Sequence, residues 1–367
     1  MKAATLAPIS RTLFAELDRI KGLEKIIRSP EYRKALSLPD ELCEEYSLLA
    51  QGEYNVNYRF THPGDGRRLL LRVNCGSQMH LEDQIGYEYR ALEMLHSSGR
   101  TPEVFYVDGT MKYLDHGVLV MEELPGLPLD YSRDMKRAAA ILADIHSTAV
   151  PEHMIPAPGD MSGRHALICP DDPLKAILDE CEQMLTKYLQ SDIADADTKA
   201  RLRELLDMAW SYRDSHGMGS SPHRCCINTE LNNTNFLISP DRADGSEDYL
   251  IDWEKPLYGD PAQDLGHFLA PTTTFWKTDV ILDEAQMDEF VREYVRSVDG
   301  RFDTSGIEER TKLFTTVTCL RGVTWCAMAW VEYRQPGRTL VNESTMLKLD
   351  QYLDHSFLER IRNILGK

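Results

Sequence analysis

No apolar run in the sequence approaches the roughly 18 residues that a membrane-spanning helix requires. The N-terminal stretch also lacks the uninterrupted apolar segment of a signal peptide, because charged side chains recur from Arg11 onward. We therefore expect neither a membrane span nor secretion, and we assign the chain to the cytoplasm.

Closely spaced cysteine pairs of the metal-binding kind are absent as well. The 8 cysteines are scattered, without a C-x-x-C pair or the Cys/His spacing that is typical of a zinc site. In the cytoplasm such thiols stay reduced. These features argue against a disulfide scaffold and against a zinc-binding module.

Basic side chains are outnumbered: 41 lysines and arginines stand against 59 aspartates and glutamates, for a formal net charge of −18. That balance argues against a nucleic-acid partner or an anionic membrane surface, since both attract cations. It is compatible with a cationic small-molecule substrate. The length of 367 residues predicts about two or three folded units.

The order of the predicted elements divides the chain into three parts. Residues 1–45 are expected to form a helical N-terminal extension, residues 46–124 a β-rich lobe with one main helix, and residues 125–367 a mostly helical lobe with a short strand pair. Alternating apolar residues around the turn HPGDG predict strands at Tyr54–Thr61 and Leu69–Val73. Strands and helices do not alternate regularly, which favours an α+β fold over a doubly wound parallel sheet.

The strand pair in the helical part carries the main chemical signal. Phe236–Ser239 and Tyr249–Ile251 are short apolar runs that flank a polar loop. If they pair as an antiparallel hairpin, Asn235 and Asp252 lie at the same end of it. A carboxamide oxygen and a carboxylate are suitable ligands for Mg²⁺. Glu230 lies five positions before Asn235, in the loop that enters the hairpin.

These segments resemble the aminoglycoside phosphotransferase and choline kinase family, which shares the protein-kinase-like fold. The resemblance is carried by "INTELNNTNFLI", "IDWE" and "GDPAQDLG". The family pattern H-G-D-x-x-x-x-N is altered here to N-T-E-x-x-x-x-N, with Asn228 in the histidine position and Glu230 in the position of the catalytic aspartate. A glutamate places its carboxylate about 1 Å further from the backbone, and a misplacement of that size can cost roughly 10²-fold in rate.

The resemblance implies a bilobal kinase that uses ATP (or GTP) and Mg²⁺. Glu230 would be the catalytic carboxylate, and Asn235 and Asp252 would hold the metal. Asn228 and Asp264 would support the catalytic loop.

The β-rich part supplies an independent indication. Strand alternation places Arg72 on the same face as Leu70, and helical spacing places Glu88 on the apolar stripe of the following helix, near Ile85 and Leu92. A carboxylate on a buried stripe needs a partner. We therefore predict an Arg72–Glu88 ion pair, which corresponds to the pair that grips the nucleotide phosphates in kinases.

Two further nucleotide contacts follow from the resemblance. The segment from Gly52 through Asn55 to Tyr58 is similar to the family's G-x-x-N-x-x-Y phosphate loop. "LVMEELPG" is similar to the hinge between lobes, where the backbone of Glu122 to Leu124 would hydrogen-bond to adenine.

The helical lobe offers candidates for the substrate wall. Trp276 follows "APTTTF", and Trp325, Met328 and Glu332 lie near one face of a later helix. Together they would form an aromatic and acidic wall for a cationic group, although a stripe of this kind also suits plain core packing. His146 is interpreted as packing at a helix end.

The leading hypothesis is an ATP/Mg²⁺-dependent kinase that phosphorylates a hydroxyl of a small molecule similar to an aminoglycoside, an amino alcohol or a sugar. A nucleotide-binding module without catalytic activity is the alternative, because Asn228 and Glu230 replace the usual pair. Phosphorylation of a protein is a third possibility. The sequence does not single out the acceptor.

Overall fold

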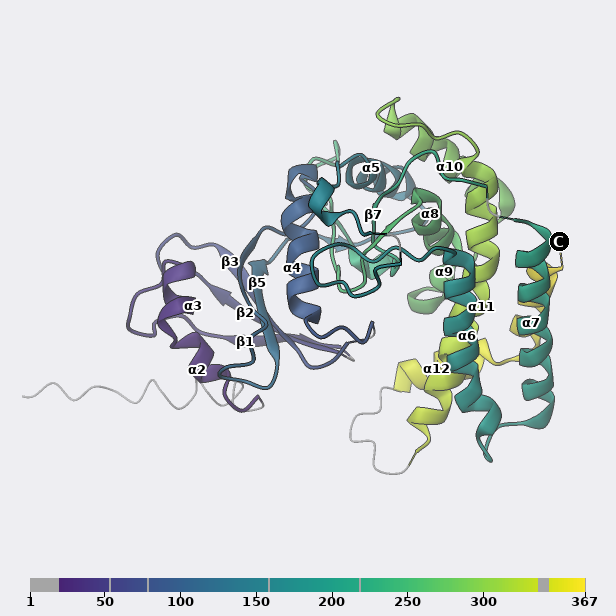
Figure 1. Ribbon diagram of the computed structural model, residues 1–367, viewed down its shortest axis with the longest axis horizontal. Helices are drawn as coiled ribbons and strands as arrows, with labels where there is room; N and C mark the ends of the chain where they lie inside the picture. Colours follow the sequence, from purple (N-terminus) through teal and green to yellow (C-terminus); the bar gives the residue numbers. More distant parts are fainter. Residues whose placement is uncertain are drawn as a thin grey trace, which may run out of the picture.

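The computed structural model describes residues 20–366 except 53, 78, 158, 218 and 336–342, with side chains omitted at positions 343 and 344. The predicted helical extension over residues 1–45 lies partly outside these residues. Figure 1 shows two parts side by side: an N-lobe built on a sheet and a larger C-lobe built from helices. The predicted α+β, bilobal, protein-kinase-like arrangement is confirmed.

The N-lobe contains a five-stranded antiparallel sheet with strand order β1-β2-β3-β5-β4. Its strands are β1 Ser47–Gln51, β2 Asn55–Thr61, β3 Arg68–Asn74, β4 Val104–Asp108 and β5 Gly117–Glu122. The predicted strands at Tyr54–Thr61 and Leu69–Val73 therefore agree with β2 and β3 to within one residue at each end. Arg72 in the central strand β3 lies between Asn57 and Leu119 of its two neighbours.

The two faces of this sheet are covered differently. Helices α2 Leu23–Ile27 and α3 Pro30–Ala35 pack their apolar side chains on one face, against Leu71 and Val73 of β3. Helix α4 Gln84–Leu95 packs toward the other face and joins the core that continues into the C-lobe. Strand alternation sends Arg72 to the α4 face. The guanidinium of Arg72 on the central strand therefore faces the space between the lobes.

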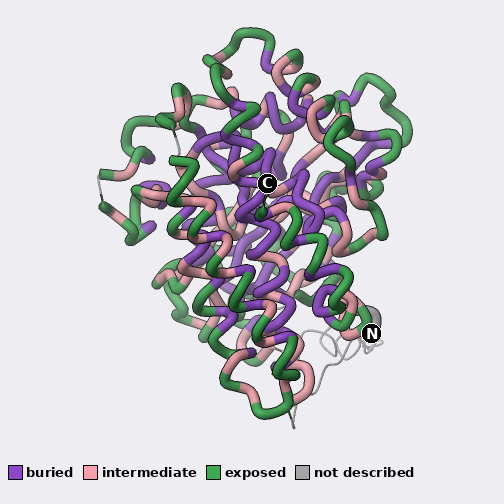
Figure 2. The backbone as a smooth tube through the Cα atoms, turned by 90° about the vertical axis from the view of Figure 1, so that its right-hand side faces the viewer, coloured by how far each residue is buried: buried purple, intermediate pink, exposed green. Residues whose placement is uncertain are grey.

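The C-lobe is a set of helices around a continuous apolar core, drawn as the buried centre of the tube in Figure 2. Its helices are α5 Met135–His146, α6 Pro173–Gln190, α7 Ala196–Ser215, α8 Pro261–Leu269, α9 Pro271–Lys277, α10 Glu284–Val298, α11 Ile307–Tyr333, α12 Glu343–Tyr352 and α13 His355–Leu365. Helix α11 packs against α6 and α8. Gly266 permits the α8 contact, because a Cβ there would lie 2.5 Å from the Cβ of Phe314.

Short strands interrupt the helices. Strands β8 Phe236–Ile238 and β9 Tyr249–Leu250 pair antiparallel, with Phe236 opposite Leu250, so the predicted hairpin is confirmed. Strand β6 Leu127–Pro128 pairs with β8 on its other side. Strands β7 Cys225–Ile227 and β10 Leu257–Gly259 form a second antiparallel pair that the sequence did not predict. Short 3₁₀ turns lie at His96–Ser98, Glu152–Met154 and Asn233–Asn235.

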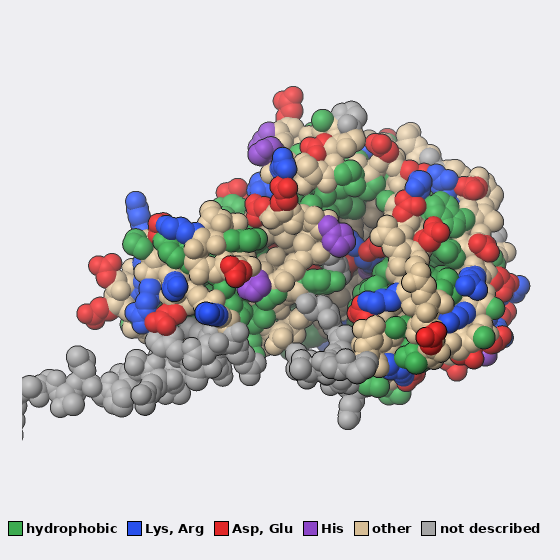
Figure 3. All heavy atoms as spheres, turned by 60° about the horizontal axis from the view of Figure 1, so that its bottom comes forward, with side chains coloured by type: hydrophobic (Ala, Val, Ile, Leu, Met, Phe, Trp, Pro, Cys, Tyr) green, Lys and Arg blue, Asp and Glu red, His purple; other side chains and the backbone are tan. Residues whose placement is uncertain are grey.

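Charged side chains of both signs are interspersed on the face of the molecule shown in Figure 3. Among the helices in the described residues, none combines the length and the apolar character needed to cross a bilayer.

Candidate active site

The hairpin of β8 and β9 brings two predicted site residues to one end. The backbone N–H of Ile251 donates to the carbonyl of Asn235 at 2.9 Å. The side-chain amide of Asn235 donates to the carbonyl of Glu230 at 2.8 Å, which leaves its carboxamide oxygen as an acceptor. Asp252 follows with a left-handed backbone (φ 66°), a conformation that non-glycine residues adopt mostly at constrained sites. Its Oδ1 lies 3.5 Å from Nη1 of Arg72.

The predicted ion pair between Arg72 and Glu88 is confirmed. Arg72 Nη1 contacts the Glu88 carboxylate, and Arg72 Nε donates to Oδ1 of Asn57 at 3.1 Å. Only 1% of the Glu88 side chain is exposed. Burial raises the pKa of Glu88 to about 7, although Arg72 acts in the opposite direction. Arg72 thus forms an ion pair with the buried carboxylate of Glu88 and also interacts with the carboxylate of Asp252.

Glu254 adds a further carboxylate that the sequence analysis quoted within IDWE without giving it a role. Asn55 donates its side-chain amide to the Glu254 carboxylate. Burial, and then the negative charges of Asp252 and Glu88, raise the pKa of Glu254 to about 8. Burial also raises the pKa of Asp252. An excess of carboxylates beside one arginine suits a divalent cation, and the oxygens of Asn235, Asp252 and Glu254 are ligands of the kind that Mg²⁺ prefers.

These raised pKa values predict that the metal-free protein loses stability as pH rises. The folded state keeps a proton on Glu254 up to about pH 8, whereas a free glutamate loses it near its ordinary pKa of 4.5. Between these two values the unfolded chain binds fewer protons, so the free energy of unfolding falls as pH increases, by an amount on the order of a few kcal/mol. We expect the melting temperature to fall between pH 5 and pH 9, and to fall less in Glu254→Gln. Equal slopes for the two proteins would contradict this assignment.

The backbone of the loop between β7 and β8 is anchored by Asp264, in the first turn of α8. The N–H groups of Asn228 and Thr229 donate to its two carboxylate oxygens, each at 2.8 Å. His146 Nε2 lies 3.1 Å from the same carboxylate, and its Nδ1 lies 2.8 Å from the hydroxyl of Tyr294. His146 and Asp264 are both fully buried. His146 therefore does more than the predicted packing at a helix end.

Asn228 and Thr229 connect this loop to the segment after β9. Asn228 accepts the N–H of Glu230 at 3.0 Å and donates to the carbonyl of Asp252 at 2.9 Å. Thr229 has a left-handed backbone (φ 68°), which is unusual for a β-branched residue, and its hydroxyl donates to the carbonyl of Lys255 at 2.8 Å. The predicted supporting residues, Asn228 and Asp264, thus hold the backbone around Glu230 and Asp252.

Removing the Asp264 carboxylate is expected to cost about 3–5 kcal/mol of stability, because Asp264→Ala leaves two buried N–H donors and His146 without their partner. Asp264→Asn keeps one acceptor oxygen and should cost less. Chemical denaturation of the three proteins checks the order. A fully stable Asp264→Ala variant would contradict an anchoring role.

The carboxylate of Glu230 lies among charges that the sequence analysis did not identify. Arg321 Nη2 of α11 contacts its Oε1 at 2.9 Å, and Nζ of Lys255 lies 3.7 Å away. Glu180 of α6 binds both cations, at 2.8 Å from Arg321 Nε and 2.9 Å from Lys255 Nζ. Burial by itself would raise the pKa of Glu230, but Arg321 and Lys255 together hold it below the ordinary value. Glu230 is therefore ionised at neutral pH and held at a defined position.

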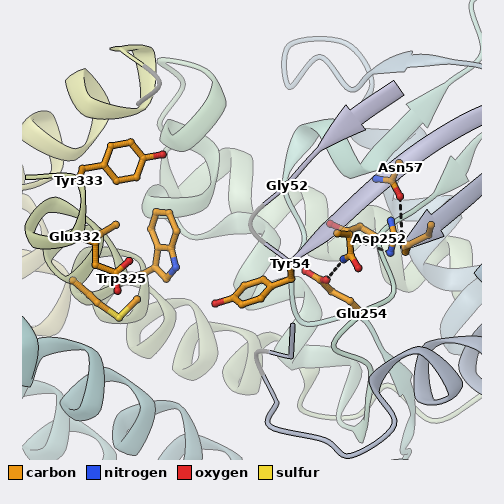
Figure 4. Close-up of a pocket in the computed structure, with 12 residues that line it drawn as sticks. Gly52, Tyr54, Asn57, Asp252, Glu254, Trp325, Glu332 and Tyr333 are labelled. Carbon is orange, nitrogen blue, oxygen red and sulfur yellow. Dashed lines mark hydrogen bonds and ion pairs between the residues drawn. The ribbon is translucent and has the colours of Figure 1, made fainter. Parts of the chain in front are cut away.

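Two cavities lie beside the candidate site residues, and Trp325 lines both of them. The interlobe cavity, about 250 Å³, lies between the N-lobe and α11 and is lined from the N-lobe side by Gly52, Asn55 and Arg72 with Asp252 and Glu254. From the other side it is lined by Trp325, Met328 and Glu332, three of the predicted wall residues. In Figure 4 the ring of Tyr54 points across this space toward Trp325.

The C-lobe cavity, about 170 Å³, is lined by Glu230 and by residues of α8, α9 and α11. Trp276, the fourth predicted wall residue, lines it, and Trp325 lines both cavities. The indoles of Trp276 and Trp325 meet edge to face, with ring centroids 5.2 Å apart. Trp325 is thus a lining residue common to the cavity that contains Glu230 and to the cavity that contains Asp252 and Arg72.

The predicted hinge residues lie outside the lining of the interlobe cavity. The N–H of Glu122 donates to the carbonyl of Glu103 at 2.8 Å, and the N–H of Glu123 donates to that of Arg68 at 3.0 Å. The N–H groups of Glu122 and Glu123 are therefore already bonded within the N-lobe.

Comparisons with known proteins agree with this architecture. Residues 45–304 match the sequence model of the phosphotransferase enzyme family. No curated protein matches the chain in sequence. Among solved structures, choline kinase from Cryptosporidium parvum Iowa II is similar with a TM-score of 0.63 at 13% identity, over 94% of this chain and 96% of its own.

Two antibiotic kinases give similar values. A spectinomycin phosphotransferase in complex with ADP and spectinomycin has a TM-score of 0.57 at 12% identity, over 89% of this chain and 94% of its own. Amicoumacin kinase hAmiN in complex with AMP-PNP, Ca²⁺ and Ami has a TM-score of 0.56 at 12% identity, over 97% of this chain and 96% of its own. At such identities the structures establish a shared fold. Since the family match covers more than half of the sequence, the chain belongs to the phosphotransferase enzyme family.

Proposed function

We propose that the protein is a kinase that uses ATP or GTP with Mg²⁺ and transfers the γ-phosphate to a hydroxyl of a small molecule. One observation carries the proposal. Trp325 is shared by two cavities, one lined by the cation Arg72 and the carboxylate Asp252, the other by the carboxylate Glu230. A phosphate donor in the first cavity and an alcohol in the second would meet between these groups.

Each residue then has a defined task. Arg72, held by Glu88, neutralises phosphate charge. Gly52 and Asn55 lie beside the phosphates, and the backbone of Glu122 and Leu124 receives the base.

Other residues would bind the metal ion and position the loop that carries Glu230. Asn235 and Asp252, with Glu254 near them, would hold Mg²⁺, which supplies charge neutralisation for the transferring phosphoryl group. Asn228 and Asp264 keep the loop in position.

Glu230 orients the acceptor hydroxyl and receives its proton. The acceptor oxygen forms a bond to the γ-phosphorus while the bond from that phosphorus to the β-phosphate oxygen breaks, and the nucleoside diphosphate leaves with the electron pair. The lowered pKa of Glu230 makes it a weak base, so most of the rate enhancement must come from position and charge stabilisation. This is the usual balance in phosphoryl transfer.

The relatives support the same chemistry. Solved structures similar to this chain hold ADP with spectinomycin, or AMP-PNP with Ca²⁺ and Ami. They make a nucleotide, a divalent cation and a small organic acceptor the expected ligands here.

The direct test is a nucleoside diphosphate release assay with MgATP and with MgGTP, across amino alcohols, aminoglycosides, sugars and polyols, followed by phosphorus NMR of any product. Acceptor-dependent release is expected. Nucleotide binding without release across the panel would instead favour a silent nucleotide-binding module, the alternative suggested by Asn228 and Glu230 in place of the usual family residues.

A further inference from the structure

The C-lobe cavity carries little net charge. Its lining includes the carboxylate of Glu230, the guanidinium of Arg321 and the imidazole of His267. The first two pair with each other at 2.9 Å. Burial, and then the positive charge of Arg321, lower the pKa of His267 to about 4, so the imidazole is neutral at physiological pH. An ammonium group placed here would meet a carboxylate whose charge, together with that of Glu180, is already balanced by Arg321 and Lys255.

The same cavity is rich in neutral hydrogen-bonding groups that have no protein partner. Among the described residues, none contacts the hydroxyl of Thr273, the hydroxyl of Thr318 or the ring nitrogens of His267 through a hydrogen bond, although Thr273 and Thr318 are only 8% and 4% exposed. Among the described residues, none forms a hydrogen bond with the indole N–H of Trp276 or Trp325 either, and both of these side chains are half-buried. These groups line the cavity and are therefore accessible to a bound molecule. A ligand that supplies several hydroxyl groups would satisfy them.

The aromatic wall restricts the shape of that ligand. Trp276 and Trp325 pack on each other edge to face, at an interplanar angle of 85° with ring centroids 5.2 Å apart, so together they form one wall of the cavity, and a ligand would lie beside this wall. An indole face packs against flat apolar surface, while its N–H can still donate to an oxygen. The cavity volume of about 170 Å³ suits one substituted ring better than a long polycation.

We propose that the acceptor is an uncharged, hydroxyl-rich ring compound, such as a sugar or a cyclitol, bound in the C-lobe cavity beside the paired indoles of Trp276 and Trp325 with its hydroxyls on His267, Thr273 and Thr318. This inference rests on the proposed kinase function. It departs from the expected cationic acceptor, because Glu332, the acid of the predicted wall, lines the interlobe cavity and is paired with Lys187. One ligand hydroxyl would reach Glu230 and attack the γ-phosphorus as described above.

The test uses the full chain and matched ligands that differ in one charge. Glucose, glucosamine and glucuronate form one set, and myo-inositol with an amino-inositol forms another. Binding is followed by the fluorescence of the cavity tryptophans, and turnover by ADP release with MgATP. We expect a neutral member to bind at least about tenfold more tightly than its charged analogues, as for a site built to hydrogen-bond hydroxyls. Preference for an amine or an acid, or binding of no neutral member, overturns the proposal.

Variants separate the C-lobe cavity from the rest of the protein. Thr318→Val should raise KM for the neutral acceptor by about tenfold with little change in KM for ATP, since it removes one hydrogen bond. Thr316→Val is the matched control on the same helix, because the Thr316 hydroxyl is bonded to the carbonyl of Lys312 outside the C-lobe cavity. Equal KM values for the two variants would count against the proposal.

The outcomes also distinguish this inference from the proposed function. ADP release with an amine and none with a neutral compound would leave the kinase standing and reject the acceptor class. Tight binding of a neutral compound without ADP release would support the acceptor class and reject the kinase function.

Discussion

Replacing Asp252 by asparagine is expected to lower phosphoryl transfer by at least roughly 10³-fold, because several kcal/mol of transition-state stabilisation by a bound metal is lost. The substitution keeps the shape of the side chain and removes only its charge. The melting temperature without nucleotide should not fall, since the pKa of Asp252 is raised by its buried surroundings and the charged form is disfavoured there. Loss of activity with unchanged or increased stability is the signature that we predict.

Asp244→Asn provides the matched control. Asp244 lies in the exposed loop between β8 and β9 and accepts hydrogen bonds from Ser246. That variant should keep full activity. An Asp252→Asn enzyme that retained more than about one tenth of the wild-type rate would show that Asp252 does not hold the metal.

Shortening Glu230 to aspartate is expected to cost about 10²-fold in kcat/KM, because the carboxylate would withdraw by about 1 Å from Arg321 and from the acceptor hydroxyl. The opposite result, a gain of activity, is the expectation for a silent module restored to the family pattern. A loss of kcat/KM in Glu230→Asp therefore favours an active kinase, whereas a gain favours a silent module. Glu182→Asp, on the exposed side of α6, is the control and should leave the rate unchanged.

The pH profile gives a second measurement on the same residue. Because Arg321 and Lys255 hold the pKa of Glu230 below the ordinary glutamate value of 4.5, the acid limb of kcat/KM that it produces should lie below that pH. In an Arg321→Met variant the limb should move to higher pH, since the main opposing charge is gone and burial then raises the pKa of the carboxyl.

The sequence predicted those features of the site that are encoded locally. The hairpin of β8 and β9 follows from two short apolar runs, and its antiparallel pairing brings Asn235 and Asp252 together. The ion pair of Arg72 and Glu88 follows from two periodicities and from the cost of an unpaired buried carboxylate.

Features that depend on packing between distant helices could not be predicted in this way. Arg321 and Glu180 are 141 positions apart, and neither lies in a recognisable motif. Their contact exists because α11 packs between α6 and α8. Lys255 follows directly on IDWE, yet nothing local indicates that it faces Glu230. The threonine hydroxyls of α9 and α11 that line the C-lobe cavity could not be predicted either. Threonines on a helix are also common in an ordinary core, so the sequence does not distinguish the two cases.

Helix α8 has one further consequence. Asp264 and His267 are three positions apart and therefore lie on neighbouring parts of the same helical face. One fixes the backbone of the loop that carries Glu230, and the other lines the C-lobe cavity, while Gly266 lets this helix approach α11 closely. The spacing between acceptor and Glu230 is thus set inside one lobe. Displacement of the N-lobe during nucleotide exchange would move Arg72, whereas Glu230 and His267 would keep their relative positions, so each new acceptor enters a site that is already aligned with Glu230.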